Sequence, residues 1–207
     1  MSGIVILPLL GFSLLAVALI LERIIFWLQL LRRQRRLVQA FFEVYRHDPW
    51  SAFALLKQNS ALPLARIFLA ALALERPTPE EFRLALESAA QAELPLLKRF
   101  STVFETIISI SPLLGLLGTI LGLMSSFSAL NIGDPGSSNA VGVTAGISDA
   151  LNSTALGLVV AIFTLLFANL FRGLYLRQMA LIQEYGGQLE LLYRRDRDRG
   201  ERMDASP

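Results

Sequence analysis

The sequence contains no cysteine and a single histidine, His47. The missing cysteine excludes disulfide bonds and thiolate chemistry, and one histidine leaves no second imidazole for a paired metal site. Charged residues are also scarce, at 17% of the chain against about 25% in an average soluble domain. Hydrophobic residues make up 54% of the 207 residues, and the formal net charge is only +2. This balance indicates a membrane protein, and nothing in it suggests nucleic-acid binding.

Three stretches of the sequence are uncharged or nearly so and long enough to cross a bilayer, which takes roughly 20 residues. They cover about residues 3–21, 106–133 and 141–171, and Asp149 is the only charge in the third. No basic residue precedes the first stretch, and its apolar run continues past Ala18. A cleaved signal peptide has a basic start and a cleavage site after its apolar core, so we expect a retained helix.

The basic residues predict the orientation of these spans. All 19 Lys and Arg fall within residues 23–99 and 172–202. Because basic residues gather on the cytoplasmic side, we expect the N-terminus outside and the C-terminus inside. The predicted organisation is then a first transmembrane helix and interface (1–31), a cytoplasmic helical segment (32–105), a second transmembrane helix (106–130), a periplasmic loop (131–140), a third transmembrane helix (141–171), and a cytoplasmic helical tail with a disordered end (172–207).

The cytoplasmic segment carries helix signals of its own. Thr78 followed by Pro79, Glu80 and Glu81 is typical of a helix start, with a threonine cap, proline at the first position and acidic residues in the first turn. Pro63 predicts an interruption of the helix that precedes it, and Pro95 predicts a kink or break in the helix that begins after Thr78. The charged sequence from residue 194 onward predicts a disordered end.

Small residues in the second and third spans predict close packing of membrane helices. Gly118 and Gly122 form one GxxxG pair, and Gly142 and Gly146 form another. Small side chains let helix backbones approach, and lipid supplies no hydrophobic drive for that approach. Further positions of this kind are Gly115 and Gly157, and Pro112 lies near the membrane boundary.

The third span has an unusual density of polar side chains around Asp149. At 100° per residue, Asn152 and Ser153 share a face with Asp149, whereas Thr154 is offset by about 140°. An intramembrane carboxylate with hydroxyl neighbours suggests an ion pathway. The same residues also suit a polar clamp that holds adjacent helices together, and a hydroxyl can bond to its own helix. The residues themselves leave both interpretations open.

Glu22 and Arg23 form a charged pair at the end of the first span, with Phe26 and Trp27 just behind it. Charged and aromatic residues in this order are typical of a membrane interface. A functional carboxylate at Glu22 is the alternative, which the adjoining Arg23 disfavours.

Residues 111–123, SPLLGLLGTILGL, and residues 145–162, AGISDALNSTALGLVVAI, resemble the two membrane motifs of the ExbB/TolQ/MotA family of proton-channel motor proteins. Glu22-Arg23 is similar to a charged pair of that family. The resemblance covers three spans in order, which fits the ExbB/TolQ branch, because flagellar MotA proteins have four. Asp149 stands where most relatives have Glu, and Phe163 stands where the family pattern has proline.

The resemblance implies a ring-shaped homopentamer in the bacterial inner membrane. Its second and third helices would line a pore around single-span partners of the ExbD or TolR type, whose membrane-embedded Asp carries the proton. It implies that Thr119 and Thr154 ring the pore with Asp149 near its outer mouth. The proton motive force would drive outer-membrane transport or envelope maintenance, with a TonB-like or other envelope protein as a further partner. No enzyme activity, cofactor or metal is implied.

Three other functions compete with this one. A non-conducting membrane scaffold would use the glycines and polar residues only for packing. A small-solute transporter is disfavoured because three spans show no internal repeat. An intramembrane hydrolase lacks a Ser/His or paired-carboxylate arrangement, and no nucleotide-binding glycine loop is present to use ATP. The cargo stays open, and the hydroxyl-rich pore of the ExbB branch favours H⁺ over Na⁺.

Overall fold

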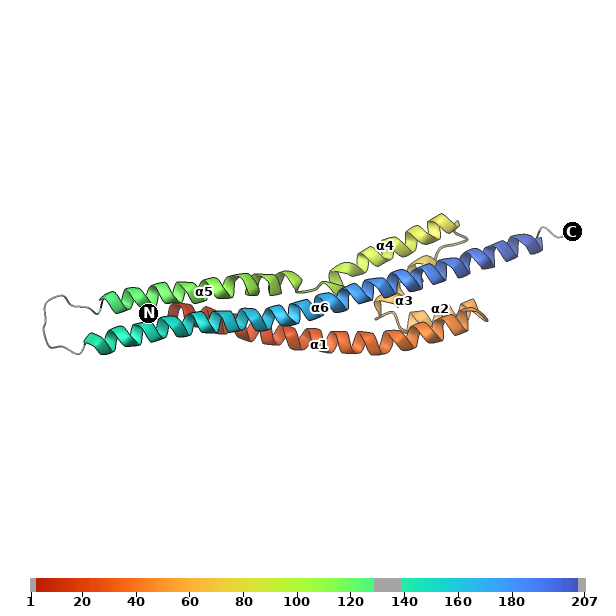
Figure 1. Cartoon of the computed structure of the whole chain (residues 1–207). Coiled ribbons are helices and arrows are strands. Elements are labelled where there is room, and N and C mark those ends of the chain that lie inside the picture. Colours follow the sequence, from red (N-terminus) through yellow and green to blue (C-terminus); the bar gives the residue numbers. More distant parts are fainter. Residues whose placement is uncertain (1–2, 129–138, 205–207) are drawn as a thin grey trace. The chain divides into compact units, whose positions relative to one another are not determined.

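The computed structural model describes the backbone of residues 3–128 and 139–204 and the side chains of residues 5–128 and 143–199. All regular structure in these ranges is α-helical, which confirms the prediction of an all-helical chain (Figure 1). Three helices, α1, α5 and α6, contain segments long and apolar enough to cross a membrane. Most of the predicted loop at 131–140 lies outside the described residues. The helices are α1 (Gly3–Tyr45), α2 (Pro49–Gln58), α3 (Pro63–Leu72), α4 (Pro79–Leu97), α5 (Ser101–Ser128) and α6 (Asn139–Asp204).

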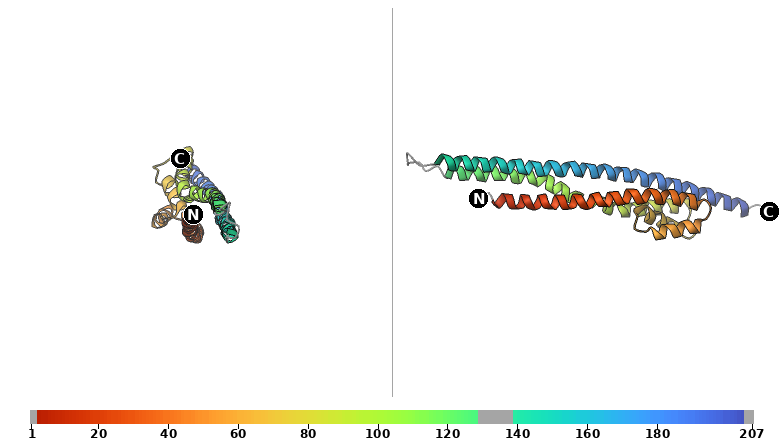
Figure 2. Two further views of the ribbon diagram at one scale, coloured as in Figure 1. Left: turned by 90° about the vertical axis from the view of Figure 1, so that its left-hand side faces the viewer. Right: turned by 90° about the horizontal axis from the view of Figure 1, so that it is seen from below.

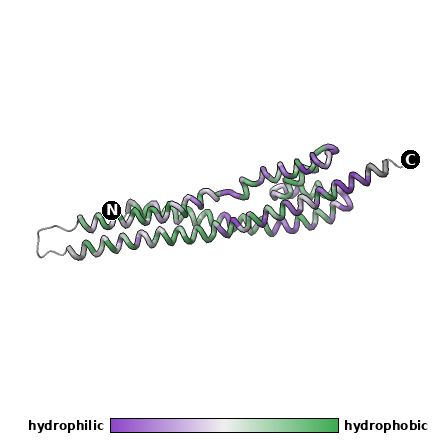
Figure 3. Tube along the Cα trace, turned by 45° about the horizontal axis from the view of Figure 1, so that its top comes forward, coloured by the Kyte–Doolittle hydropathy of each residue, from purple (hydrophilic) through white to green (hydrophobic). Residues whose placement is uncertain are grey.

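The chain forms two compact units, and α1 and α6 each contribute to both. Unit 1 consists of residues Met1–Arg23 and Phe100–Arg172, and unit 2 consists of Ile24–Arg99 and Gly173–Pro207. Apolar residues dominate α5 and the first part of α6, whereas hydrophilic residues gather toward the end of α6 (Figure 3). Unit 1 therefore contains most of the lipid-compatible sequence.

In unit 1, α5 and the first part of α6 run side by side (Figure 2). Both helices turn bulky apolar side chains outward, among them Leu113, Phe127 and Phe163. The side chains between the helices are small or polar, apart from contacts such as the ring pair Phe104–Phe171 at 5.8 Å. A helix hairpin with large apolar groups outside and small groups inside suits a lipid environment.

Unit 2 has a conventional aromatic core. The ring of Phe41 on α1 packs against Phe68 on α3 at 5.1 Å between centroids. The ring of Phe82 on α4 stacks on Tyr193 of α6, with centroids 4.2 Å apart and planes 3° from parallel. These contacts join residues far apart in sequence, so α1, α3, α4 and α6 share one hydrophobic interior in this unit.

The helix signals of the connecting segment act as predicted. The Thr78 hydroxyl accepts the backbone N–H of Glu81 at 3.2 Å, and the Glu81 carboxylate accepts the backbone N–H of Thr78 at 2.7 Å. This reciprocal pair is a capping box, with Pro79 at the first helical position. The predicted start of α4 is confirmed.

Proline also limits the helices. Helix α3 begins at Pro63, and α4 ends at Leu97, two residues beyond Pro95. The chain then passes through Phe100, whose φ of 67° is left-handed, before α5 begins. The predicted interruption at Pro63 is thus confirmed, whereas Pro95 lies inside α4 and the break comes only after Leu97.

The end of the chain differs from the prediction. Helix α6 continues to Asp204, so residues 194–204 are helical and not disordered. The alternating charges in this segment can pair along a helix, as Arg194 and Glu190 do at 2.7 Å one turn apart. Such i,i+4 pairs support a helix that the composition alone does not favour.

Candidate functional site: the polar contact between α5 and α6

Glycines bring the backbones of α5 and α6 into close contact in unit 1. A Cβ atom added to Gly115 would lie 3.0 Å from the backbone of Thr154, and one added to Gly157 would lie 2.5 Å from the Ser111 carbonyl oxygen. Farther along, a Cβ on Gly122 would lie 2.9 Å from the Gly146 carbonyl oxygen. No larger side chain fits these positions without moving a helix. The glycines of both helices therefore fix how α5 and α6 pack.

Hydroxyl groups bridge the same two helices. Thr154 Oγ1 on α6 donates to the Gly115 carbonyl oxygen on α5 at 3.1 Å. Ser153 Oγ lies 3.3 Å from the same oxygen, and its nearer acceptor, at 2.8 Å, is the Ala150 carbonyl oxygen of its own helix. Nearer the other end of the contact, the Ser126 hydroxyl is shared between the Val143 carbonyl oxygen on α6 at 3.2 Å and the Gly122 carbonyl oxygen of its own helix at 3.1 Å. Glycine makes these bonds possible, because only at short separation can a short side chain reach a carbonyl of the next helix.

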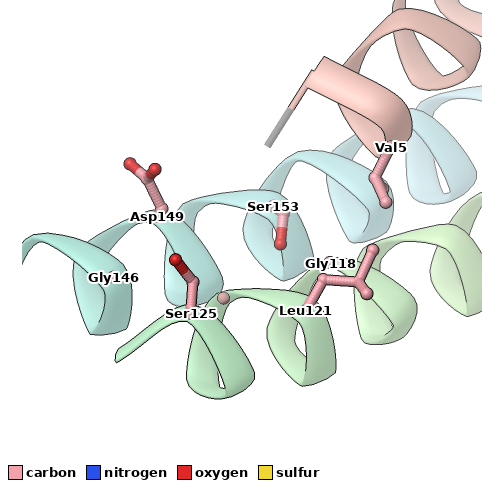
Figure 4. A pocket seen from close by; sticks show the side chains of 8 residues that line it. Val5, Gly118, Leu121, Ser125, Gly146, Asp149 and Ser153 are labelled. Atoms are coloured by element: carbon pink, nitrogen blue, oxygen red, sulfur yellow. The ribbon is translucent and has the colours of Figure 1, made fainter. Parts of the chain in front are cut away.

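A small cavity lies between the helices, beside the start of α1 (Figure 4). Its volume is about 40 Å³, and a water needs roughly 10–15 Å³ measured in this way. The space therefore suits a few water molecules. It is lined by Val5, Gly118, Leu121, Gly122, Ser125, Gly146, Asp149 and Ser153.

Asp149 contributes the only charge at this cavity. Its carboxylate stands out from α6, whereas the Ser153 side chain points toward α5 (Figure 4). Asp149 and Asn152 are exposed in the single chain, and Ser153 is only 5% exposed. The sequence puts the three residues on one side of α6. In the structure, Ser153 lies in the contact with α5, whereas Asp149 and Asn152 lie at the exposed surface. The cavity can supply water and hydroxyl partners to a carboxylate at its edge.

The two threonines predicted to line a pore have different surroundings. Thr119 is partly exposed and its hydroxyl donates to the Leu116 carbonyl of its own helix at 2.6 Å. Thr154 is partly buried and bridges to α5, as described above. The structure therefore places the Thr154 hydroxyl against the Gly115 carbonyl of α5. Thr119 lies one turn farther along α5 and takes no part in this bond.

The other predicted residues are placed as follows. Pro112 lies inside α5 without ending it, and Phe163 lies exposed in an unbroken α6. Gly142 falls in α6, outside the residues whose side chains are described. Glu22 is half-buried, and Arg23 is only 2% exposed, so this guanidinium lies inside the protein. A position for the pair at the membrane interface stays a prediction.

Sequence reasoning did not single out Ser125 and Ser126. Ser125 lines the cavity and Ser126 bridges the helices. The signal was available, since Ser126 lies four residues after Gly122 and so falls on the glycine face of α5. Among the described residues, no three His, Cys, Asp or Glu side chains gather as metal ligands. The site is a polar contact between two helices, with one carboxylate at the edge of a cavity that has room for water.

Fold and site together define a multi-pass helical membrane protein with a carboxylate and hydroxyl groups at the contact between two apolar helices. Residues 59–184, more than half of the chain, match the model of the MotA/TolQ/ExbB proton channel family. The protein belongs to this family, which confirms the resemblance drawn from the two motifs.

Individual relatives place the chain on the ExbB/TolQ side of the family. It is 67% identical over 203 residues to the ExbB-like 3 protein of Synechocystis sp., covering 98% of this chain and 97% of that one. The biopolymer transport protein ExbB of Salmonella typhimurium is 37% identical over 102 residues, covering 49% of this chain and 41% of the relative. The Tol-Pal system protein TolQ of Haemophilus influenzae is 35% identical over 108 residues, covering 51% and 44%.

Proposed function

We propose that this protein is the proton-channel subunit of an inner-membrane motor that converts the proton motive force into mechanical work. The observation that carries the proposal is the Asp149 carboxylate at the edge of a hydratable cavity between two glycine-packed helices. A carboxylate in a membrane helix is costly unless it faces protein or water, and its presence marks ion pathways. Because the chain belongs to a proton channel family, the proton is the ion that we assign to this pathway.

The mechanism needs a second protein. The chain forms a homopentamer, with its N-terminus in the periplasm and its C-terminal helical extension in the cytoplasm. Single-span partners of the ExbD or TolR type occupy the pore and carry the proton on a membrane-embedded Asp. Asp149 and the cavity water hand protons to that Asp near the outer mouth, and Thr119 and Thr154 offer a neutral path farther in. The protein catalyses no chemical reaction and passes motion to envelope machinery that works in outer-membrane transport or envelope maintenance.

Proton uptake by reconstituted vesicles tests the proposal. The chain is co-expressed with a one-span partner that bears an intramembrane Asp, purified, and placed in vesicles with a trapped pH-sensitive dye. Asp149→Asn removes the charge with little change in shape, so the proton flux should fall at least tenfold while the native mass of the complex stays pentameric. Flux unchanged in Asp149→Asn would contradict the proposed pathway.

A matched pair of threonines on α6 sharpens this test. Thr154 bridges to α5, whereas Thr164 is buried and donates to Val160 of its own helix at 2.7 Å. Thr154→Val should reduce the flux strongly, and Thr164→Val should leave it near the wild-type value. Equal effects of the two substitutions would mean that a hydroxyl at position 154 has no special role.

A non-conducting scaffold remains the second candidate, because one observation favours it. The hydroxyls of Ser126, Ser153 and Thr154 each lie within hydrogen-bond distance of a carbonyl oxygen on the facing helix, as in a polar clamp. In that case Thr154→Val would break the oligomer, as measured by native mass, and wild-type vesicles with any partner would show no flux above that of empty vesicles.

A further inference from the structure

Unit 2 carries a cluster of exposed cations at one level of the molecule, which we call the basic belt. Arg32, Arg33, Arg35 and Arg36 lie on α1, Lys98 follows the end of α4, and Arg177 lies on α6. All six side chains are exposed. Residues 24–42, 94–104 and 173–183, which contain the belt, include no Asp or Glu. The cluster is therefore purely cationic.

Two contacts within unit 2 bring these residues to the same level. Gln178 Nε2 donates to Gln34 Oε1 at 2.8 Å, and both amides are buried, at 1% and 3% exposure. This bond ties the centre of the arginine cluster on α1 to the residue beside Arg177. In addition, the Lys98 ammonium lies 5.0 Å from the ring centre of Tyr175, one half-turn before Arg177. Cations from three helices thus converge although up to 145 positions separate them in the sequence.

The buried Gln34 also sets the direction of the four arginines. Successive residues turn by 100°, so Arg33 and Arg35 flank Gln34 at about 100° to either side. Arg32 and Arg36 lie about 160° away, nearly opposite the buried amide. The four side chains therefore fan over the outer surface of α1. The described side chains include no ion-pair partner for any of them.

Along the sequence of α1, the belt follows directly after an apolar stretch long enough to cross a bilayer. Exposed apolar side chains on α1 run from Leu7 to Leu28, and 21 residues of α-helix rise about 32 Å. The hydrocarbon core of a bilayer is about 30 Å thick. The first exposed cation comes one turn after Leu28, at Arg32. On α6 the first exposed cation after the apolar surface is Arg172, two residues after the exposed Leu170, and Arg177 follows five residues later. Along the sequence of α1, the belt therefore begins where the apolar span ends, which is where basic residues are expected to meet lipid headgroups.

We propose that the basic belt is a binding surface for anionic phospholipid headgroups, which hold unit 2 to the membrane surface. Guanidinium groups suit phosphate because they present several N–H donors in a planar fork. Clusters of four to eight Lys and Arg beside a membrane helix attract acidic lipids. The inference concerns the lipids around the protein and does not depend on the proposed proton pathway.

Lipid titration of the full chain in neutral detergent micelles tests the proposal. Phosphatidylglycerol, phosphatidylcholine and soluble glycerol phosphate are added in separate arms, and bound lipid is counted by native mass spectrometry alongside the thermal midpoint. Phosphatidylglycerol should bind at least tenfold more tightly than phosphatidylcholine and raise the midpoint. The preference should shrink as salt is raised, because salt screens exposed charges. Glycerol phosphate should have no effect at the same concentration.

Charge-matched variants locate the binding surface. Each cation near an anionic surface contributes about fivefold to binding, so Arg33→Gln/Arg36→Gln should weaken phosphatidylglycerol binding by up to about 25-fold. Arg46→Gln/Arg195→Gln removes two exposed arginines outside the belt. This control should change the affinity for phosphatidylglycerol by less than about twofold. If the first pair fails to fold, Arg33→Lys/Arg36→Lys keeps the charge and should retain the lipid preference.

Three outcomes would overturn the proposal. The wild-type chain binding both lipids equally would show that charge does not matter. Equal losses in the belt and control variants would show that net charge, and not this surface, attracts the lipid. A glycerol phosphate effect as large as that of phosphatidylglycerol would make a soluble anion the ligand.

Discussion

Gly157→Ala should destabilise the pairing of α5 and α6. The added Cβ would lie 2.5 Å from the Ser111 carbonyl oxygen and 3.1 Å from Gly115 Cα. Both neighbours are backbone atoms, so no side chain can rotate away and the helices must separate. Overpacking of this kind costs about 1–3 kcal/mol, and alanine returns at most about 1 kcal/mol through its better helix propensity. With the full return from helix propensity, the net loss in the free energy of unfolding should still reach about 2 kcal/mol.

Gly173→Ala is the matched control, because a Cβ at this helical position meets nothing within 4 Å. It should be neutral or stabilise by up to about 1 kcal/mol. The chain has no cysteine, so dyes can be attached at Met124→Cys and Leu151→Cys, both exposed on the hairpin. Loss of energy transfer with increasing dodecyl sulfate then reports separation of the helices. The packing argument fails if Gly157→Ala separates at the same detergent fraction as Gly173→Ala, or later.

Three further predictions concern unit 2. Glu93→Gln should lower the free energy of unfolding by about 1–3 kcal/mol, because the Glu93 carboxylate accepts two hydrogen bonds from Arg66, at 2.6 and 2.5 Å. Thermal unfolding measures this loss, and an unchanged midpoint would contradict it. The pKa of Glu81 is lowered by bonds from the Thr78 backbone and side chain, so its stabilisation is complete above the ordinary glutamate pKa and disappears as pH falls through the lowered value. Thr78→Ala should flatten that acid-side loss in a pH series of midpoints, and an identical pH profile would refute the link. Tyr193→Phe keeps the ring stack but loses the 2.7 Å bond from its hydroxyl to a backbone carbonyl, so it should cost about 1 kcal/mol, and Tyr193→Ala clearly more.

Local signals made much of this structure predictable. The Thr78 cap, the break at Pro63 and the apolar spans each depend on residues close together in sequence, and all appear as expected. The GxxxG pattern likewise marked the faces on which α5 and α6 meet. Membership of the proton channel family was predictable because its two motifs are continuous stretches of sequence, residues 111–123 and 145–162.

Other features depend on partners that the sequence does not reveal. On α6, a rotation of 100° decides whether Asn152 or its neighbour Ser153 enters the helix contact, and only the position of α5 settles this. The bond between Gln34 and Gln178 joins residues 144 positions apart. No local signal indicated that the Arg23 side chain would be buried. Such outcomes follow from tertiary packing and not from local propensity.

The glycine contact between α5 and α6 also limits how this part of the protein can move. Turning α6 about its own axis by one residue would bring Leu156 or Leu158 to the place of Gly157, where even a single methyl group does not fit. Sliding by less than a full turn would meet the same obstacle. The hairpin of α5 and α6 therefore moves as one rigid unit. If several such chains assemble, surfaces that slide against one another must lie on the outer faces of these hairpins.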